Sequence, residues 1–317
     1  MATRGRIVMF GTPAFAVPAL EALCDEHEVL ALVCQPDRPS GRGNVLTAPP
    51  TKVAALARGI LVHQPEKVKD GALAAWLRAL APDLAVVVAY GRILPLEVLT
   101  APRLGCVNVH ASVLPRWRGA SPIQHAVLAG DTETGVTLMQ MDVGMDTGAL
   151  LSIRRTTIGP DETAEALGER LSALGAQMLR EDLGHVLEGA LTPVPQDEAH
   201  ATHAPMLSRD QGRLQWNRPA RELHNQVRGL QPWPGASTTL GARRLIVNAT
   251  RLDGAPVVYA GAPGEVVAIT RDRLWVATRE GLLGLTELQL EGKKRMGVKE
   301  FCAGHPLRTG TLLGGAS

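Results

Sequence analysis

The sequence predicts a two-domain α/β protein: an open, mostly parallel β-sheet with helices on both faces, followed by a small C-terminal β-barrel. Short apolar runs alternate with helical segments through the first half, which is typical of a parallel sheet. Runs such as 84–89 are apolar on both faces, as expected of strands that helices cover on both sides. At 317 residues, the chain also exceeds the roughly 100–200 residues of one average domain.

The first half divides into the following elements. Strands are expected at residues 6–10, 27–35, 84–89, 106–111 and 135–141. Helices are expected after the turn Gly11-Thr12-Pro13 and at residues 50–58, 70–80 and 122–129. A long helix is expected at 163–187, where apolar residues recur near helical spacing, and it should cap the first domain.

The second half changes character after a polar stretch. Residues 189–209 mix Gly, Pro, His and Thr without periodicity and are interpreted as a linker, either an ordered strap across the first domain or a flexible tether. A short helix at 220–228 and strands at 244–249, 264–270, 273–278 and 282–290 follow, separated by Gly and Asp turns. The expected domains are therefore 1–188 and 210–317, joined by the linker.

Composition excludes several classes of protein. With 45% hydrophobic and 20% charged residues, the chain is neither disordered, nor collagen, nor a disulfide miniprotein. It has no run of about 18 uncharged apolar residues, so no membrane span is expected. The four scattered cysteines suit neither a disulfide framework nor a zinc site. An apolar strand begins by residue 6 and leaves no room for a signal peptide, which favours the cytoplasm.

Charge is distributed unevenly between the two halves. The overall net charge is +2, but residues 1–209 carry −4 and residues 210–317 carry +6. A basic C-terminal third suggests an anionic partner, with nucleic acid the first candidate. The alternative is an ordinary solvated basic surface.

One group of polar side chains is suited to chemistry. Asn108 and His110 stand two apart on the predicted strand 106–111, so both point to one face at its C-terminal end, where open α/β sheets bind ligands. Both can donate to a carbonyl oxygen on which negative charge develops. The glycine-bounded loop after the next strand carries Asp142 and Asp146, either of which can complete the site. The alternatives are a structural histidine and an acidic turn.

Several segments together resemble the folate-dependent formyltransferases. The resemblance rests on residues 108–123 (NVHASVLPRWRGASPI) and 141–148 (MDVGMDTG), and it extends to residues 10–18, 35–43, 231–236 and 292–296 in the family's order. Val113, Trp117 and Ser121 depart mildly from the usual residues, and none of them is at the expected chemistry. The resemblance implies a Rossmann-like formyltransferase domain and an OB-like barrel.

The resemblance also implies a reaction. The α-amino group of methionine esterified to initiator tRNA, the partner in translation initiation, attacks the formyl carbon of the co-substrate 10-formyltetrahydrofolate. The reaction passes through a tetrahedral oxyanion and requires neither a metal nor a covalent enzyme intermediate. Asn108 and His110 would stabilise the oxyanion, and Asp146 would accept and relay the amine proton.

Binding residues follow from the same resemblance and from the charge pattern. The expected folate contacts are Ser112, Val113, Leu114, Pro115, Val88, Ala89, Tyr90 and Gly91, together with the 141–146 loop. The expected tRNA contacts are Arg42, in the long polar loop 35–50, and the basic cluster Lys293, Lys294 and Arg295. The alternatives are core packing for Val113 and Leu114, a plain surface loop for Arg42, and a solvated β-turn for the lysines.

Other functions are compatible with the same polar residues. Formyltransferases that act on amino-sugar nucleotides or glycinamide ribonucleotide would share Asn108, His110 and Asp146. The basic second domain argues against the glycinamide enzyme, and the 141–148 motif against the sugar enzymes. A catalytically idle RNA-binding or folate-binding protein is the alternative from another class. The sequence does not indicate the oligomeric state.

Overall fold

The computed structural model describes residues 4–41, 43–257 and 259–314, which form two compact units. The first unit comprises Met1–Pro122, Glu133–Thr157 and Gly168–Pro205. The second comprises Ile123–Thr132, Ile158–Leu167 and Met206–Ser317. The second unit thus includes two segments from residues 1–188, the expected first domain, whereas the sequence suggested one continuous boundary.

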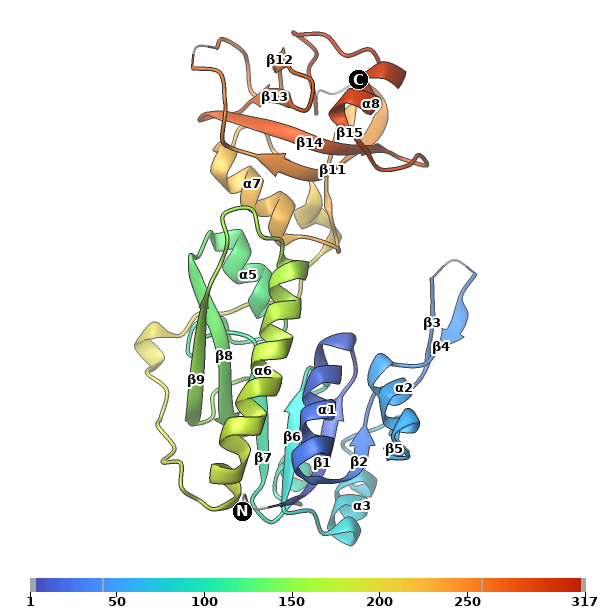
Figure 1. Cartoon of the computed structure of the whole chain (residues 1–317), viewed down its shortest axis with the longest axis vertical. Coiled ribbons are helices and arrows are strands. Elements are labelled where there is room, and N and C mark those ends of the chain that lie inside the picture. The colour runs from blue at the N-terminus through green and yellow to red at the C-terminus, as the bar shows by residue number, and fades with distance from the viewer. Residues whose placement is uncertain (1–3, 42, 258, 315–317) are drawn as a thin grey trace. The chain divides into compact units, whose positions relative to one another are not determined.

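A seven-stranded sheet forms the centre of the first unit (Figure 1). Its order is β5 (Leu61–His63), β2 (Glu28–Val33), β1 (Arg6–Gly11), β6 (Leu84–Val88), β7 (Cys106–His110), β8 (Glu133–Gln140) and β9 (Leu150–Thr157). Strands β5 to β7 are parallel, whereas β8 and β9 pair antiparallel. The open, mostly parallel sheet predicted from the sequence is confirmed.

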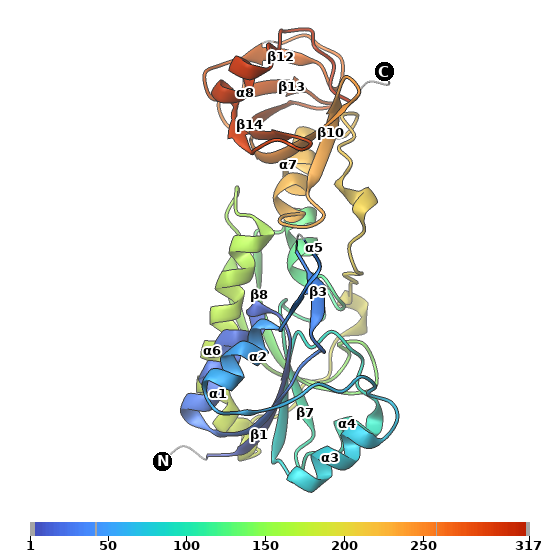
Figure 2. The same ribbon diagram turned by 90° about the vertical axis from the view of Figure 1, so that its right-hand side faces the viewer.

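Helices cover both faces of this sheet, as Figure 2 shows. The helices α1 (Val17–Glu26), α2 (Pro50–Ala57) and α6 (Ala164–Leu187) lie on one face. The helices α3 (Ala72–Leu80) and α4 (Leu96–Leu99) pack on the other, over a core of β1, β2 and β6 side chains. The loop expected at 35–50 contains a short hairpin, β3 (Arg38–Ser40) and β4 (Val45–Thr47).

The pleat of β7 decides which face carries the polar side chains. Cys106 packs with α3 and α4, and its Sγ donates to carbonyls of α4. Val109 lies against Gly175 of α6, where an added Cβ would come within 2.9 Å of it. Because side chains alternate along a strand, Asn108 and His110 share the α3 and α4 face with Cys106.

The second unit contains an antiparallel sheet packed with helices. The strand order is β10 (Ala236–Leu240), β11 (Arg243–Arg251), β14 (Leu282–Leu290), β13 (Leu274–Ala277) and β12 (Val266–Ile269), with β15 (Met296–Gly297) beside β14. Its apolar face packs with α7 (Ala220–Gly229) and α8 (Val298–Gly304). Most of helix α5 (Pro122–Ala129) also belongs to this unit.

Residues 310–314 connect the two edges of this sheet. Thr311 accepts from Val266 of β12, and Leu313 donates to Gly264 just before that strand. Gly314 donates to Thr239 of β10, and Leu313 bridges Leu240. Within the described part of the chain, no ladder joins β10 directly to β12. The sheet is thus consistent with the small barrel expected from the sequence, although its strands alone do not close it.

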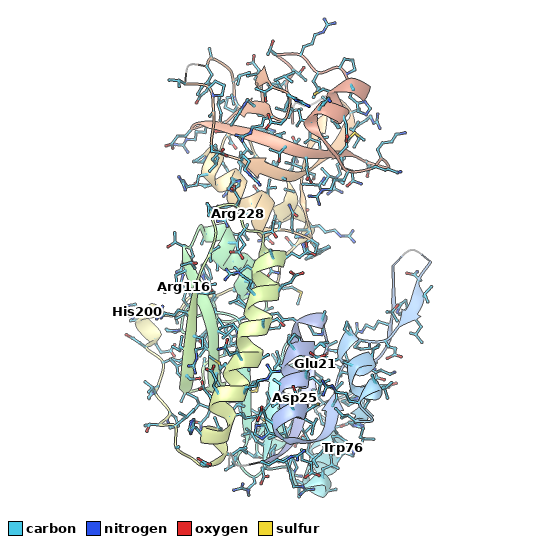
Figure 3. The ribbon with its side chains drawn as sticks, in the orientation of Figure 1. Glu21, Asp25, Trp76, Arg116, His200 and Arg228 are labelled. Atoms are coloured by element: carbon cyan, nitrogen blue, oxygen red, sulfur yellow. The ribbon has the colours of Figure 1, made fainter. Side chains whose placement is uncertain are left out.

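Helix α7 carries several buried polar side chains, among them Arg228 and His224. Arg228, labelled in Figure 3, donates to the carbonyls of Gly159 and Glu162. His224 is only 3% exposed; its Nε2 donates to the carbonyl of Pro160 at 3.0 Å, and Thr250 donates to its Nδ1 at 2.8 Å. Burial lowers the pKa of His224, so the imidazole is held in its neutral form.

Candidate active site

Two neighbouring strands bring their carboxyl ends to the candidate site. Asn108 and His110 are the last polar residues of β7, 9% and 5% exposed, and Val87 of β6 pairs with Asn108. The segment 88–91 therefore begins beside them. This edge of a parallel sheet is where ligands of open α/β proteins bind.

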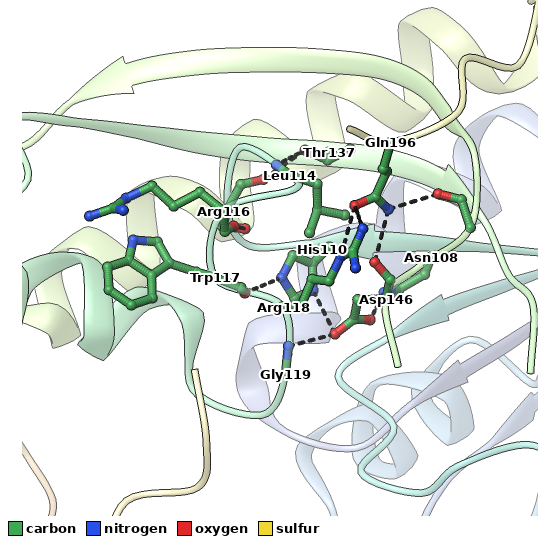
Figure 4. Close-up of polar contacts among 12 residues, drawn as sticks. Asn108, His110, Leu114, Arg116, Trp117, Arg118, Gly119, Thr137, Asp146 and Gln196 are labelled. Atoms are coloured by element: carbon green, nitrogen blue, oxygen red, sulfur yellow. Dashed lines mark hydrogen bonds and ion pairs between the residues drawn. The ribbon is translucent and has the colours of Figure 1, made fainter. Parts of the chain in front are cut away.

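Asp146 meets both side chains from the loop that follows β8 (Figure 4). Its Oδ1 lies 3.4 Å from Nδ2 of Asn108, and its Oδ2 lies 3.6 Å from Nδ1 of His110. Its Oδ2 also accepts from the backbone N–H of Gly119 at 2.8 Å. Of the two carboxylates proposed for this loop, Asp146 is therefore the one that joins Asn108 and His110. Asp142 instead accepts from Gly144 and Thr147 inside the loop.

The hydrogen bonds of His110 define where a proton is held. Its Nε2 lies 2.9 Å from the carbonyl oxygen of Trp117. A carbonyl only accepts, so Nε2 carries a hydrogen, and Nδ1 is the nitrogen turned toward the Asp146 carboxylate. The imidazole and the carboxylate thus form a pair in which a proton can be shared or exchanged.

Backbone strain gathers around this pair. Ala89, Trp117 and Asp146 have left-handed φ angles of 48°, 66° and 56°. Such conformations cost about 1–3 kcal/mol each for residues other than glycine and are found preferentially at functional sites. Gly148 also constrains the loop after Asp146, because a Cβ there would lie 1.9 Å from the carbonyl oxygen of Gln140.

The residues expected to contact folate occupy different depths. Ser112 is fully buried and donates to the carbonyl of Arg116, and Leu114 is 2% exposed, while Val113 and Pro115 are half-buried. Val88 is buried, whereas Ala89 and Gly91 are exposed. The ring of Tyr90 packs in the core against Phe10, and burial raises its pKa to about 12. The backbone of this second segment is thus the part that reaches the surface.

Thr12 and Gln35 fix the backbone of segment 88–91. The hydroxyl of Thr12 donates to the Tyr90 carbonyl at 3.1 Å, and Nε2 of Gln35 donates to the carbonyls of Tyr90 and Gly91. Both side chains come from other strand ends of the sheet. These hydrogen bonds fix the carbonyl groups of Tyr90 and Gly91 at the carboxyl edge of the sheet.

A cavity of about 490 Å³ adjoins the Asp146 loop. Its walls include Lys69, residues 93–97 and Val143 of the Asp146 loop. Ile93, Val143 and Met145 are 61%, 68% and 57% exposed, so apolar surface is left uncovered there. A second cavity of about 610 Å³, near Lys52 and Leu61, shares no residue with the candidate active site.

The residues expected to contact tRNA are only partly described. Arg42 lies outside the described residues. In the strand β4 of the same polar loop, Val45 and Leu46 are 65% and 66% exposed. Lys293 and Lys294 are exposed. Arg295 is also exposed but forms an ion pair with Glu287.

Sequence reasoning missed a buried arginine that lies beside the site. Arg118 is 3% exposed, and its guanidinium donates to Oε1 of Gln196 at 3.0 and 2.9 Å. It also pairs with both carboxylate oxygens of Glu198. Gln196 in turn donates to the carbonyls of Asp146 and Gly148. The only signal in the sequence was an arginine inside the segment 108–123 that carries the resemblance. Its burial could not be predicted, because its side-chain partners lie about 80 positions further along the chain.

Metal and membrane features were searched in the described residues. That part of the chain contains no group of three or more His, Cys, Asp or Glu side chains arranged to hold a metal ion. It also contains no helix with the length and apolarity needed to cross a bilayer.

With this fold and this site, the chain belongs to the formyl transferase family. The model described as "Formyl transferase" matches residues 5–183, and "Formyl transferase, C-terminal domain" matches residues 206–306. Methionyl-tRNA formyltransferases are similar over nearly the full length. The protein from Sorangium cellulosum is 49% identical over 98% of this chain and 99% of its own, and that from Anaeromyxobacter dehalogenans is 52% identical over 94% and 96%.

Solved structures share the fold at low sequence identity. An N-formyltransferase from Helicobacter canadensis, in complex with folinic acid and dTDP-3-aminofucose, has a TM-score of 0.67 at 15% identity and covers 90% of this chain and all of its own. HypX from Aquifex aeolicus, in complex with tetrahydrofolic acid, has a TM-score of 0.62 at 17% identity, over 95% of this chain. This chain spans about half the length of HypX.

Proposed function

We propose that this chain transfers the formyl group of 10-formyltetrahydrofolate to the α-amino group of methionyl initiator tRNA, in the cytoplasm, for translation initiation. The observation that carries the chemistry is the convergence of Asn108, His110 and Asp146 at the end of β7. The names of the relatives at about half identity support the choice of acceptor. In this proposal residues 1–188 carry catalysis, 189–209 link the domains and 210–317 bind tRNA.

Asn108 stabilises the negative charge that develops during the transfer. When the amine attacks the formyl carbon, charge builds on the formyl oxygen. One amide hydrogen of Asn108 points toward Asp146, and the second remains to donate to that oxygen. A preorganised donor of this kind is worth about 2.7–4 kcal/mol in acyl transfer. The imidazolium form of His110 adds positive charge beside the same oxygen.

Asp146 accepts the proton that the attacking amine loses. Its carboxylate faces His110 at 3.6 Å and is held by Gly119, so a proton can pass directly or through water. The same pair returns a proton to the departing folate nitrogen as the intermediate collapses. Proton transfer by a positioned side chain contributes about 10²–10⁴-fold to a rate.

The 490 Å³ cavity adjoins the proposed folate site through Val143 of the 141–146 loop. Small-molecule pockets are about 300–1,000 Å³ and mostly apolar, with few polar groups that fix orientation. The exposed Ile93, Val143 and Met145 offer apolar surface for a flat ring system, and the backbone of 88–91 offers amides and carbonyls.

The basic second unit supports tRNA binding. Lys293 and Lys294 are exposed on the turn after β14, and the N–H of Glu291 donates to the carbonyl of Arg244 on β11. The exposed Arg244 therefore lies beside the turn that carries the basic cluster. Cationic patches gain affinity for nucleic acid because they release counterions from phosphates. Arg42 would contribute from the first unit.

A transfer assay with several acceptors tests this function. The full chain and 10-formyltetrahydrofolate are incubated with methionyl initiator tRNA, methionyl elongator tRNA, an amino-sugar nucleotide or glycinamide ribonucleotide. We expect formyl transfer to the methionyl initiator tRNA, with kcat/KM well above that for every other acceptor. Faster transfer to the amino-sugar nucleotide or to glycinamide ribonucleotide would contradict the proposal.

A further inference from the structure

Residues 189–205, here called the strap, run beside the loop that carries Trp117 and Gly119. The N–H of Arg118 donates to the Thr202 carbonyl at 2.9 Å, and the N–H of Ala204 donates to the Arg118 carbonyl at 2.7 Å. The hydroxyl of Thr202 accepts from the N–H of Trp117 at 2.9 Å. This loop supplies the carbonyl that binds His110 and the N–H that binds Asp146. The strap therefore fixes the backbone behind both catalytic side chains.

The strap also holds the loop of Asp146 itself. Val194 pairs with Leu150 through two backbone hydrogen bonds of 2.8 and 2.9 Å. Nε2 of Gln196 donates to the carbonyls of Asp146 and Gly148, at 2.8 Å each. Asp146 is left-handed at φ 56°, and a carbonyl fixed in this way keeps the strained residue in place. Trp117, the other strained residue on these two loops, is bound by Thr202.

Arg118 joins the two halves of this arrangement. Its backbone lies between Trp117 and Gly119, while its guanidinium binds Oε1 of Gln196 twice. Gln196 can therefore donate to Asp146 in only one orientation, because its oxygen is occupied by Arg118. Glu198 balances the buried charge with two further contacts.

We propose that Gln196 and Arg118 are positioning residues, through which the strap holds Asp146 and His110 in reactive geometry. The inference rests on the proposed function only in that catalysis is its first readout. A loop displaced by about 1 Å can cost about 100-fold in rate, even when no reacting group is removed. The segment between the two domains is thereby a part of the catalytic machinery.

Two variants of one residue separate positioning from simple packing. Gln196→Leu removes every polar contact at nearly constant size, whereas Gln196→Glu keeps the oxygen that accepts from Arg118 and removes the donation to Asp146. Gln177→Leu is the matched control, because Gln177 is exposed on α6 and its Nε2 donates to Glu181 of the same helix. Formyl transfer to methionyl initiator tRNA and hydrogen exchange of the 143–149 amides are measured for each full-length chain.

We expect both Gln196 variants to lower kcat about 10- to 100-fold, with the KM for folate and the thermal midpoint little changed. Exchange at 143–149 should quicken in both variants and stay unchanged in Gln177→Leu. Normal kcat with normal exchange in Gln196→Glu would overturn the proposal. So would a loss of activity matched by a loss of folded protein with unaltered exchange. If the wild type transfers no formyl group, the proposed function fails, and exchange alone decides the role of the strap.

Discussion

Replacement of Asp146 by Asn tests the proton transfer at nearly constant shape. The asparagine oxygen can keep the 2.8 Å contact with the N–H of Gly119. Its amide nitrogen then takes the Oδ1 position, 3.4 Å from the nitrogen of Asn108, where two donors face each other. The charge opposite His110 is lost as well. Because general acid–base catalysis supplies about 10²–10⁴-fold, we expect kcat to fall by that factor, or about 2.7–5.4 kcal/mol.

Steady-state kinetics with methionyl initiator tRNA measures this loss. The KM for folate should stay within about threefold, because the variant removes an interaction that matters mainly in the transition state. Asp142→Asn is the control: it removes a charge from the same loop, and its oxygen can still accept from Gly144 and Thr147. A kcat for Asp146→Asn within tenfold of the wild type, or equal losses in both variants, would refute the assignment.

Three further predictions concern binding and stability. The double variant Lys293→Ala/Lys294→Ala should bind all tRNAs more weakly, and its log affinity should fall less steeply with log salt, by about 0.9 per lost duplex phosphate contact. Unchanged affinity and slope in filter binding would assign these lysines to a solvated turn. Arg42→Ala should raise the KM for tRNA much more than the KM for folate, and equal tRNA kinetics would exclude Arg42 from tRNA recognition. His224→Gln should flatten the pH dependence of stability, because burial lowers the pKa of His224. The unfolded state binds the extra proton, so the wild type loses stability as the pH falls below about 6.5, by at most about 1.4 kcal/mol per pH unit. Urea unfolding of both proteins at pH 7.5 and 5.5 measures the loss of stability between the two pH values. An equal loss in the wild type and in His224→Gln would contradict the prediction.

Local pattern was sufficient for most of the fold. The helix expected at 122–129 and the strand expected at 282–290 have those bounds in the structure. The strand at β8 was predicted, but its antiparallel direction was not, because alternation of elements carries no sign of direction. Strand β9 was missed, since five of its eight residues are polar or charged and it lies at the sheet edge. Such strands form because they pair with a neighbouring strand, and the local periodicity of the sequence does not show that pairing.

The candidate site divides in the same way. The spacing of Asn108 and His110 placed both on one face, because a strand alternates its side chains. The approach of Asp146 depends on a loop whose path is set by Gly148 and by Gln196, 50 residues further along the chain. No pattern in 189–209 distinguished an ordered strap from a tether. Its hydrogen bonds to Arg118 and Leu150 exist only once the first unit has folded.

The five residues 310–314 pair with backbone groups at both borders of the sheet in the second unit. The outermost strands of a sheet display unpaired N–H and C=O groups, which can serve as templates for another chain. Here the backbone of 310–314 occupies such groups beside both β10 and β12. A chain without this segment would keep its core strands, but β10 and β12 would expose unpaired backbone N–H and C=O groups. We therefore expect deletion of residues 310–314 to favour strand pairing between copies of the second unit.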